Sequence, residues 1–72
     1  MKKGQISNNI RRLRFDHDEM TQKELAEKTG VSRQTIVAIE KAKYSPSLEL
    51  AFQIAYAFGR PVQDVFSYEN FE

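Results

Sequence analysis

Apolar residues recur at helical spacing along most of the chain. Ile10 and Leu13 lie three positions apart, which places both on one face of a helix. A capping residue at Ser7 or Asn8 gives this helix a start, and we expect it to run to about His17. The pattern therefore predicts that the chain enters its fold through a short amphipathic helix.

Four further helices follow from the same spacing. The second is predicted at 22–29 and the third from 33 to about 42. The fourth, at 48–58, is apolar on most of its circumference, so it should occupy the centre of the core. A short helix at 61–66 comes last, and 67–72 is a tail that is either a strand or disordered. The chain is thus predicted to be all-α, with five helices and the option of a short strand at its end.

Two helix-start signals stand eleven residues apart in the middle of the chain. In the first, Thr21 can cap the backbone amides while Glu24, three residues later, reaches back to the amide of the cap. In the second, Ser32 caps the next helix. Gly30 lies between them, where the first helix must end at positive φ. Two short helices joined by so tight a turn form a helix-turn-helix, which offers the start of its second helix to the major groove of DNA.

Charge is divided unevenly between the two parts of the chain. Residues 1–43 carry ten Lys and Arg against six Asp and Glu, a net charge of +4. Residues 44–72 carry one Arg against four acids, a net charge of −3. The basic part contains the helix-turn-helix, so we expect one face of the molecule to meet phosphates and the acidic part to stay away from them.

Length and composition exclude several classes of protein. Seventy-two residues are enough for one domain, which we place over 1–72 with its helical core at about 6–66. The lack of cysteine excludes a disulfide framework, a thiolate metal site and a cysteine nucleophile, and one histidine leaves no catalytic pair, so we do not expect an enzyme. No signal peptide or membrane-spanning run follows the basic start, so a cytoplasmic protein is expected. We expect no cofactor, no metal and no small-molecule effector site.

Five segments, the first two of them within the helix-turn-helix, stand in a characteristic order and spacing: Thr21 to Ala26, Gly30 to Ile36, Ile39 to Lys41, Ser45 to Ala51 and Pro61 to Phe66. With these segments the chain resembles short regulators of the Cro/cI type, also called the xenobiotic-response-element family. The likeness covers nearly all of 10–66 and leans toward the compact dimeric repressors. It implies a transcriptional regulator that binds a palindromic operator in double-stranded DNA, and it favours a repressor over an activator. The regulator would act as a homodimer with its third helix in the major groove.

The third helix should present its base readers on the side away from the core. Because each helical residue turns about 100° from the last, the side opposite the buried isoleucines carries Gln34, Val37, Ala38 and Lys41, with Arg33 at its edge. A glutamine amide pairs bidentately with adenine and an arginine with guanine, whereas Val37 and Ala38 can read only shape or a thymine methyl. The alternative is that Arg33 and Gln34 are ordinary surface residues of a first helical turn.

Other residues should contact the DNA backbone rather than the bases. The resemblance places Gln22, at the start of the second helix, against the sugar-phosphate backbone, and it places Lys41 and Lys43 after the third helix against phosphates. Ser32 and Thr35 join this set. The alternatives are that Gln22 is a plain helix former and that the lysines interact with the dipole at the end of the third helix.

The first and third helices should be tied together by charge. The resemblance pairs Arg14 with Glu40 in a partly buried ion pair, which makes Glu40 structural. The alternative, from charge alone, is that Arg14 contacts a phosphate. Two departures from the family pattern bear on these helices. The connection 14–21 is one residue longer than usual and lacks the glycine usually found before Met20. Ala42 stands where glycine commonly ends the third helix. Either the backbone at Ala42 does not need a positive φ, or the helix ends differently.

The last third of the chain carries more apolar residues than so small a core can cover. The surplus consists of Pro61, Val62, Val65, Phe66 and Tyr68. We expect these residues to form a two-fold dimer contact; the alternative is that they cap the core of the monomer. They also suit a second function, a protein-interaction module such as an antitoxin that masks a protein partner.

Overall fold

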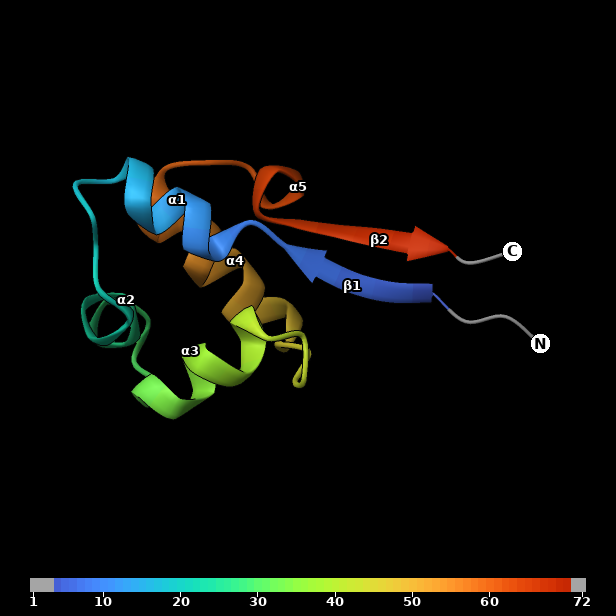
Figure 1. Ribbon diagram of the computed structural model, residues 1–72, viewed down its shortest axis with the longest axis horizontal. Coiled ribbons are helices and arrows are strands. Elements are labelled where there is room, and N and C mark those ends of the chain that lie inside the picture. Colours follow the sequence, from blue (N-terminus) through green and yellow to red (C-terminus); the bar gives the residue numbers. More distant parts are fainter. Residues whose placement is uncertain (1–3, 71–72) are drawn as a thin grey trace.

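The computed structural model describes residues 4–70 and consists of five helices and a two-stranded antiparallel ribbon (Figure 1). In chain order the elements are β1 (Gly4–Asn8), α1 (Ile10–Asp16), α2 (Gln22–Thr29), α3 (Arg33–Glu40), α4 (Leu48–Phe58), α5 (Val62–Val65) and β2 (Phe66–Asn70). The helices pack into one body, and the ribbon extends from it along the longest axis of the molecule. The predicted five-helix fold is confirmed. Within residues 4–70 no helix is long and apolar enough to cross a membrane.

Local capping chemistry starts the two helices of the helix-turn-helix, α2 and α3, where the sequence predicts. Thr21 Oγ1 accepts a hydrogen bond from the Glu24 amide at 3.0 Å, and Glu24 Oε1 accepts one from the Thr21 amide at 2.8 Å. Gly30 ends α2 with a φ of 76°, in the left-handed region that glycine adopts without a Cβ penalty. Ser32 Oγ then accepts a hydrogen bond from the Thr35 amide at 3.1 Å. Both helix starts are therefore fixed by side chains within the motif.

Helix α1 begins later than predicted. Ser7 and Asn8, expected as its caps, lie in β1, and Asn9 is the residue before the first helical turn. Asn8 Oδ1 accepts a hydrogen bond from the Ile10 amide at 3.1 Å, so its side chain assists the helix start although its backbone belongs to the strand. The prediction is wrong here because β1 exists only through pairing with β2, near the other end of the chain.

Three residues other than glycine adopt the left-handed backbone conformation around the helix-turn-helix. Asp18 and Glu19 have φ values of 60° and 53° in the connection before α2, where the family glycine is missing. Ala42 has a φ of 60° just after α3, which ends at Glu40 rather than at about 42. The backbone therefore adopts the conformation that glycine favours without having a glycine, which costs about 1–2 kcal/mol for each L residue.

The ribbon joins the two ends of the described chain. Ile6 lies opposite Tyr68, and Asn8 lies opposite Phe66. Because alternate residues of a strand share a face, the apolar side chains of both strands lie on the same side of the ribbon. A Cβ at Gly4 would overlap the Tyr68 ring, so only glycine allows the tyrosine to lie across β1. The strand predicted as an option in the tail is present, but it begins at Phe66, which was expected in the last helix; residues 71–72 of that tail lie outside the described part.

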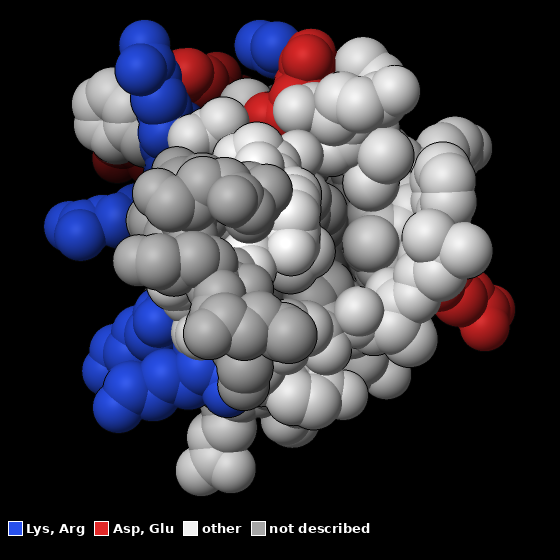
Figure 2. Space-filling model, turned by 90° about the vertical axis from the view of Figure 1, so that its right-hand side faces the viewer, with Lys and Arg blue, Asp and Glu red and all other residues white. Residues whose placement is uncertain are grey.

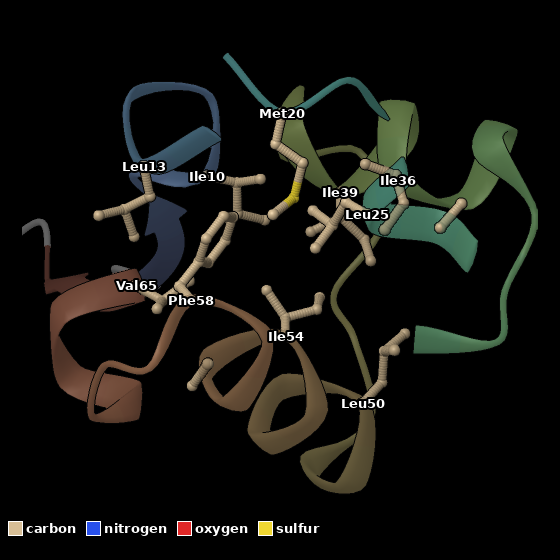
Figure 3. Packing of buried hydrophobic residues seen from close by; sticks show 12 residues of the cluster. Ile10, Leu13, Met20, Leu25, Ile36, Ile39, Leu50, Ile54, Phe58 and Val65 are labelled. Carbon is tan, nitrogen blue, oxygen red and sulfur yellow. The ribbon is translucent and has the colours of Figure 1, made fainter. Parts of the chain in front are cut away.

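Side chains from all five helices meet in the core (Figure 3). Its fully buried members are Ile10, Leu25, Ile36, Ile39, Ile54 and Val65. As predicted, α4 runs through the centre, where it buries Ile54 and Phe58. Its opposite side is not covered, since Leu48, Phe52 and Tyr56 are exposed. The apolar circumference of α4 therefore contributes both to the core and to the surface.

Val65 belongs to this core. Its side chain is 0% exposed, and the Asn9 amide donates a hydrogen bond to its carbonyl at 2.8 Å, which holds the end of α5 against the start of α1. The prediction that Val65 lies beyond the core and contacts a partner subunit is therefore wrong, because no part of the side chain reaches the surface. Val62 and Phe66 are half-buried, and Pro61 and Tyr68 are exposed.

Candidate nucleic-acid interface

The solvent-facing side of α3 carries the residues predicted to read bases. Arg33 and Gln34, in its first turn, are exposed. Val37 and Ala38, in the next turn, are half-buried. The start of α3 thus offers a guanidinium and an amide, and its middle offers an apolar surface. These are the groups that pair with guanine, with adenine and with the methyl group of thymine.

Ser32 and Thr35 use their hydroxyl groups within the turn. The two hydroxyl oxygens lie 2.9 Å apart and share a hydrogen bond, while Ser32 also accepts the Thr35 amide. Both residues lie at the N-terminal end of α3, where the positive end of the helix dipole attracts a phosphate. Their first role in the structure is to shape the start of α3.

The ion pair expected between α1 and α3 is present. Arg14 Nε donates to Glu40 Oε2 at 2.7 Å, and Arg14 Nη2 donates to Glu40 Oε1 at 3.2 Å. Only 15% of the arginine side chain and 9% of the glutamate side chain are exposed. Arg14 Nη1 donates to the Met20 carbonyl at 2.9 Å, so each of its three nitrogens is engaged by the protein. Arg14 therefore connects α1, the chain before α2 and the end of α3.

Two amide side chains complete the attachment of α3. Gln22 Nε2 donates to Glu40 Oε1 at 3.2 Å, which ties the start of α2 to the end of α3. Asn8 Nδ2 donates to the Ile39 carbonyl at 2.9 Å and so satisfies one of the free carbonyls at the end of α3. The recognition helix is thus held at its C-terminal end by residues of β1, α1 and α2. Of these, Asn8 was not predicted as part of the site.

A polar groove opens between α1, the start of α2 and α3. Its lining includes Arg11, Gln22, Lys23, Arg33, Glu40 and Lys41. Four of the predicted DNA-contacting residues therefore lie together around one groove: Gln22, Arg33, Val37 and Lys41. Arg11 was not predicted as a site residue, although its position one helical turn before Arg14 places both on the same side of α1.

The two lysines that follow α3 are both exposed. Lys41 caps the helix, and the Lys43 amide donates to the Ala38 carbonyl at 2.9 Å, which holds the backbone of Lys43 against the last turn of α3. Lys43 does not share the polar groove with Lys41. Figure 2 shows Lys and Arg side chains of the described residues gathered mainly along one edge of the molecule.

Two of the residues predicted to contact a partner line an apolar hollow beside the ribbon. Its lining includes Ile6, Pro46, Leu48, Ala51, Val62 and Phe66. Of the predicted set, Val62 and Phe66 take part, whereas Pro61 lines a separate groove beside α4 and Tyr68 lies on the exposed ribbon. Sequence reasoning missed Ile6 and Leu48. The alternation of Gln5, Ile6 and Ser7 is the signal that could have indicated a strand at Ile6.

Comparison with known proteins agrees with this geometry. Residues 10–65 match the helix-turn-helix family. The chain is 54% identical over 67 residues to an uncharacterized HTH-type transcriptional regulator of Methanocaldococcus jannaschii, an alignment that covers 93% of this chain and 100% of the relative. It is 48% identical over 59 residues to the uncharacterized HTH-type transcriptional regulator YgzD of Bacillus subtilis, covering 82% of this chain and 85% of YgzD.

A more distant relative is the cryptic phage CTXphi transcriptional repressor RstR of Vibrio cholerae. The two are 38% identical over 62 residues, which is 86% of this chain and 55% of RstR. The family match spans the helix-turn-helix together with the helices that hold it, from the start of α1 to the end of α5. The chain belongs to the Cro/cI-type helix-turn-helix family of DNA-binding transcriptional regulators.

Proposed function

We propose that this protein is a cytoplasmic homodimeric repressor that binds a palindromic DNA operator, with α3 of each protomer in a major groove. The observation that carries the proposal is the side of α3 away from the core, where Arg33 and Gln34 are exposed at the start of a capped and anchored helix. In this role Arg33 pairs with guanine and Gln34 with adenine, each contributing about 1–3 kcal/mol of discrimination. Val37 and Ala38 contact thymine methyl groups or follow the shape of the groove.

Positioning on the duplex comes from residues around the reading surface. Gln22, Lys41 and Lys43 contact the sugar-phosphate backbone, and the hydroxyl groups of Ser32 and Thr35 add contacts at the start of α3. The amide of Gln22 is already oriented by its hydrogen bond to Glu40, which supports this role because a fixed donor loses little freedom on binding. These contacts supply affinity that does not depend on sequence.

A dimer is supported by the apolar hollow beside the ribbon. Val62 and Phe66 line it, and Leu48 at its rim is 75% exposed. A surface that carries both a projecting leucine and an apolar hollow can complement a second copy of itself across a two-fold axis. Two copies would then present two α3 helices about one helical repeat, ~34 Å, apart on the DNA.

Repression is supported by the relative RstR, which is named a transcriptional repressor. A protein that occupies an operator can regulate by exclusion alone, and this requires only the surfaces described above.

The test begins with selection of bound sites from a random DNA pool, followed by titration of variants on the selected operator and on a scrambled duplex. Gln34→Ala should weaken operator binding by about 1–3 kcal/mol and relax preference at one base pair. Lys43→Ala should weaken both duplexes alike and lower the salt slope by about one unit. Equal losses on both duplexes for Gln34→Ala would show that Gln34 does not read a base. Copurification of an unrelated protein with no selective DNA retention would favour a protein-interaction module instead.

A further inference from the structure

Helix α1 carries three arginines, and in only one of them is the guanidinium held by buried contacts within the fold. Arg14 is held by Glu40 and the Met20 carbonyl, so its nitrogens are not available for phosphate. Arg12 lies 3.9 Å from Asp16 in an exposed pair. Arg11 is exposed and takes part in no ion pair within residues 4–70. The cation on α1 that remains free is therefore Arg11.

The position of Arg11 distinguishes it from its neighbour. Arg11 precedes Arg14 by three residues, so the two lie on the same side of α1, and Arg11 lines the polar groove together with Gln22, Arg33 and Lys41. Arg12 is turned by a further ~100° around the helix. It shares a neighbouring hollow with Arg11 and lines a second hollow without Arg11, but it lines no part of the polar groove. Of the two side chains, only that of Arg11 therefore borders the proposed DNA surface.

From this placement we infer that Arg11 binds a backbone phosphate and that α1 is a third DNA-contacting element beside α2 and α3. In the proposed mode of binding, Gln22 contacts the sugar-phosphate backbone. One strand of the duplex therefore passes the start of α2 when α3 lies in the major groove. The polar groove lies under this strand, with Arg33 and Lys41 on its α3 side and Arg11 on its α1 side. A guanidinium can donate two parallel hydrogen bonds to one phosphate. Arg11 alone can therefore hold the DNA strand on the α1 side of the polar groove.

The inference rests on the proposed mode of DNA binding and adds a contact to it. Arg11 carries no base-reading role, because α1 lies outside the major groove in this arrangement. Its contribution should therefore be the same on any sequence and should fall as salt rises. Arg14 cannot substitute for it, since moving Arg14 toward DNA would break its two hydrogen bonds to Glu40.

The experiment compares Arg11→Ala with Arg12→Ala, which remove the same charge from adjacent positions of one helix. Operator and scrambled-duplex binding is measured by fluorescence anisotropy at several salt concentrations. Arg11→Ala should reduce the slope of log K against log salt by about 0.9 on both duplexes. Arg12→Ala should leave the slope at the wild-type value. Arg11→Lys should retain the slope, because the charge remains, with weaker binding from the loss of the bidentate geometry.

Each result then has a defined meaning. Circular dichroism and thermal unfolding should be unchanged in all three variants, since neither Arg11 nor Arg12 contributes to the core. An unchanged slope for Arg11→Ala, or an equal reduction for Arg12→Ala, overturns the inference, the second because it would reveal a general charge effect. If Lys43→Ala lowers the slope and Arg11→Ala does not, the proposed DNA-binding function is retained and only the phosphate contact of Arg11 is refuted. If the wild type shows no salt-dependent binding to the selected operator, both the proposed function and the contact of Arg11 are refuted.

Discussion

Removing either partner of the Arg14 and Glu40 ion pair should cost this protein a large part of its stability. Glu40→Leu would leave the guanidinium of Arg14 with only the Met20 carbonyl, in a site where 15% of the side chain meets water. Arg14→Met would leave the carboxylate of Glu40 with only the Gln22 amide. In each case a charge stays in a mostly dry position without its counterpart, and the desolvation that the pair offsets is no longer compensated.

The size of the effect follows from burial. Breaking a fully buried pair costs about 3–5 kcal/mol, and the remaining exposure here reduces the expected loss to about 2–3 kcal/mol. A chain of 72 residues has a free energy of unfolding of roughly 4–11 kcal/mol at 0.05–0.15 kcal/mol per residue. Either single variant should therefore lower Tm by roughly 10–20 °C. In the double variant Arg14→Met/Glu40→Leu no unpaired charge remains, so about 1–2 kcal/mol should be recovered.

Urea unfolding followed by circular dichroism, at one fixed protein concentration, measures all three variants. The matched control is Arg12→Met, which removes an arginine of the same helix from an exposed pair with Asp16 at 3.9 Å and should change stability by less than about 0.5 kcal/mol. Strict additivity of the two single variants would refute the coupling. A loss in Arg12→Met equal to that in Arg14→Met would show that the cost comes from α1 itself rather than from the pair.

Four further variants test the backbone, the core and the dimer surface. Ala42→Gly should stabilise the protein by about 0.5–1 kcal/mol in the same unfolding assay, because it removes the strain of an L residue at a φ of 60°, which exceeds the added entropy of the unfolded glycine; a destabilised variant would contradict this. Gly30→Ala should cost about 1–2 kcal/mol, since Gly30 has a φ of 76°, and a neutral result would mean that the turn relaxes. Val65→Asp should unfold the protein, whereas Leu48→Glu should leave it helical and convert a dimer to a monomer in sedimentation; a wild type that sediments as a monomer would exclude the contact.

The parts of the fold that the sequence predicts are those whose causes lie within a few residues. The capping box of Thr21 and Glu24, the turn at Gly30 and the cap at Ser32 each involve neighbours in the chain, and each is found where expected. The limits of α4 follow in the same way from a cap at Ser47 and a left-handed Gly59. Local chemistry is sufficient for these boundaries, because the groups that satisfy the helix ends are supplied by the helix itself.

The parts that the sequence does not predict depend on contacts between distant segments. Asparagine is a residue type that often caps helices, and the backbone of Asn8 belongs to a strand only because it pairs with Phe66. The burial of Val65 likewise depends on how α5 is held against Asn9, which no helical periodicity in 4 residues can encode. The spacing places Arg11 on the same side of α1 as Arg14, but the groove that this side borders emerges only when α1 is placed beside α3.

In the proposed mode of DNA binding, the residues that read bases are separate from the residues that hold α3 in place. Arg33 and Gln34 are exposed and contribute nothing to the core, so their replacement should alter the operator while leaving the fold intact. Glu40 belongs to the same helix, yet it contacts Arg14 and Gln22 rather than solvent, and its loss should affect every operator alike. Because α3 is anchored at its C-terminal end and its proposed base readers lie at its N-terminal end, one scaffold can carry many recognition surfaces. Chains of this family can therefore differ in the sequence they recognise through a few exposed positions of α3, provided that the contacts to its last turn are kept.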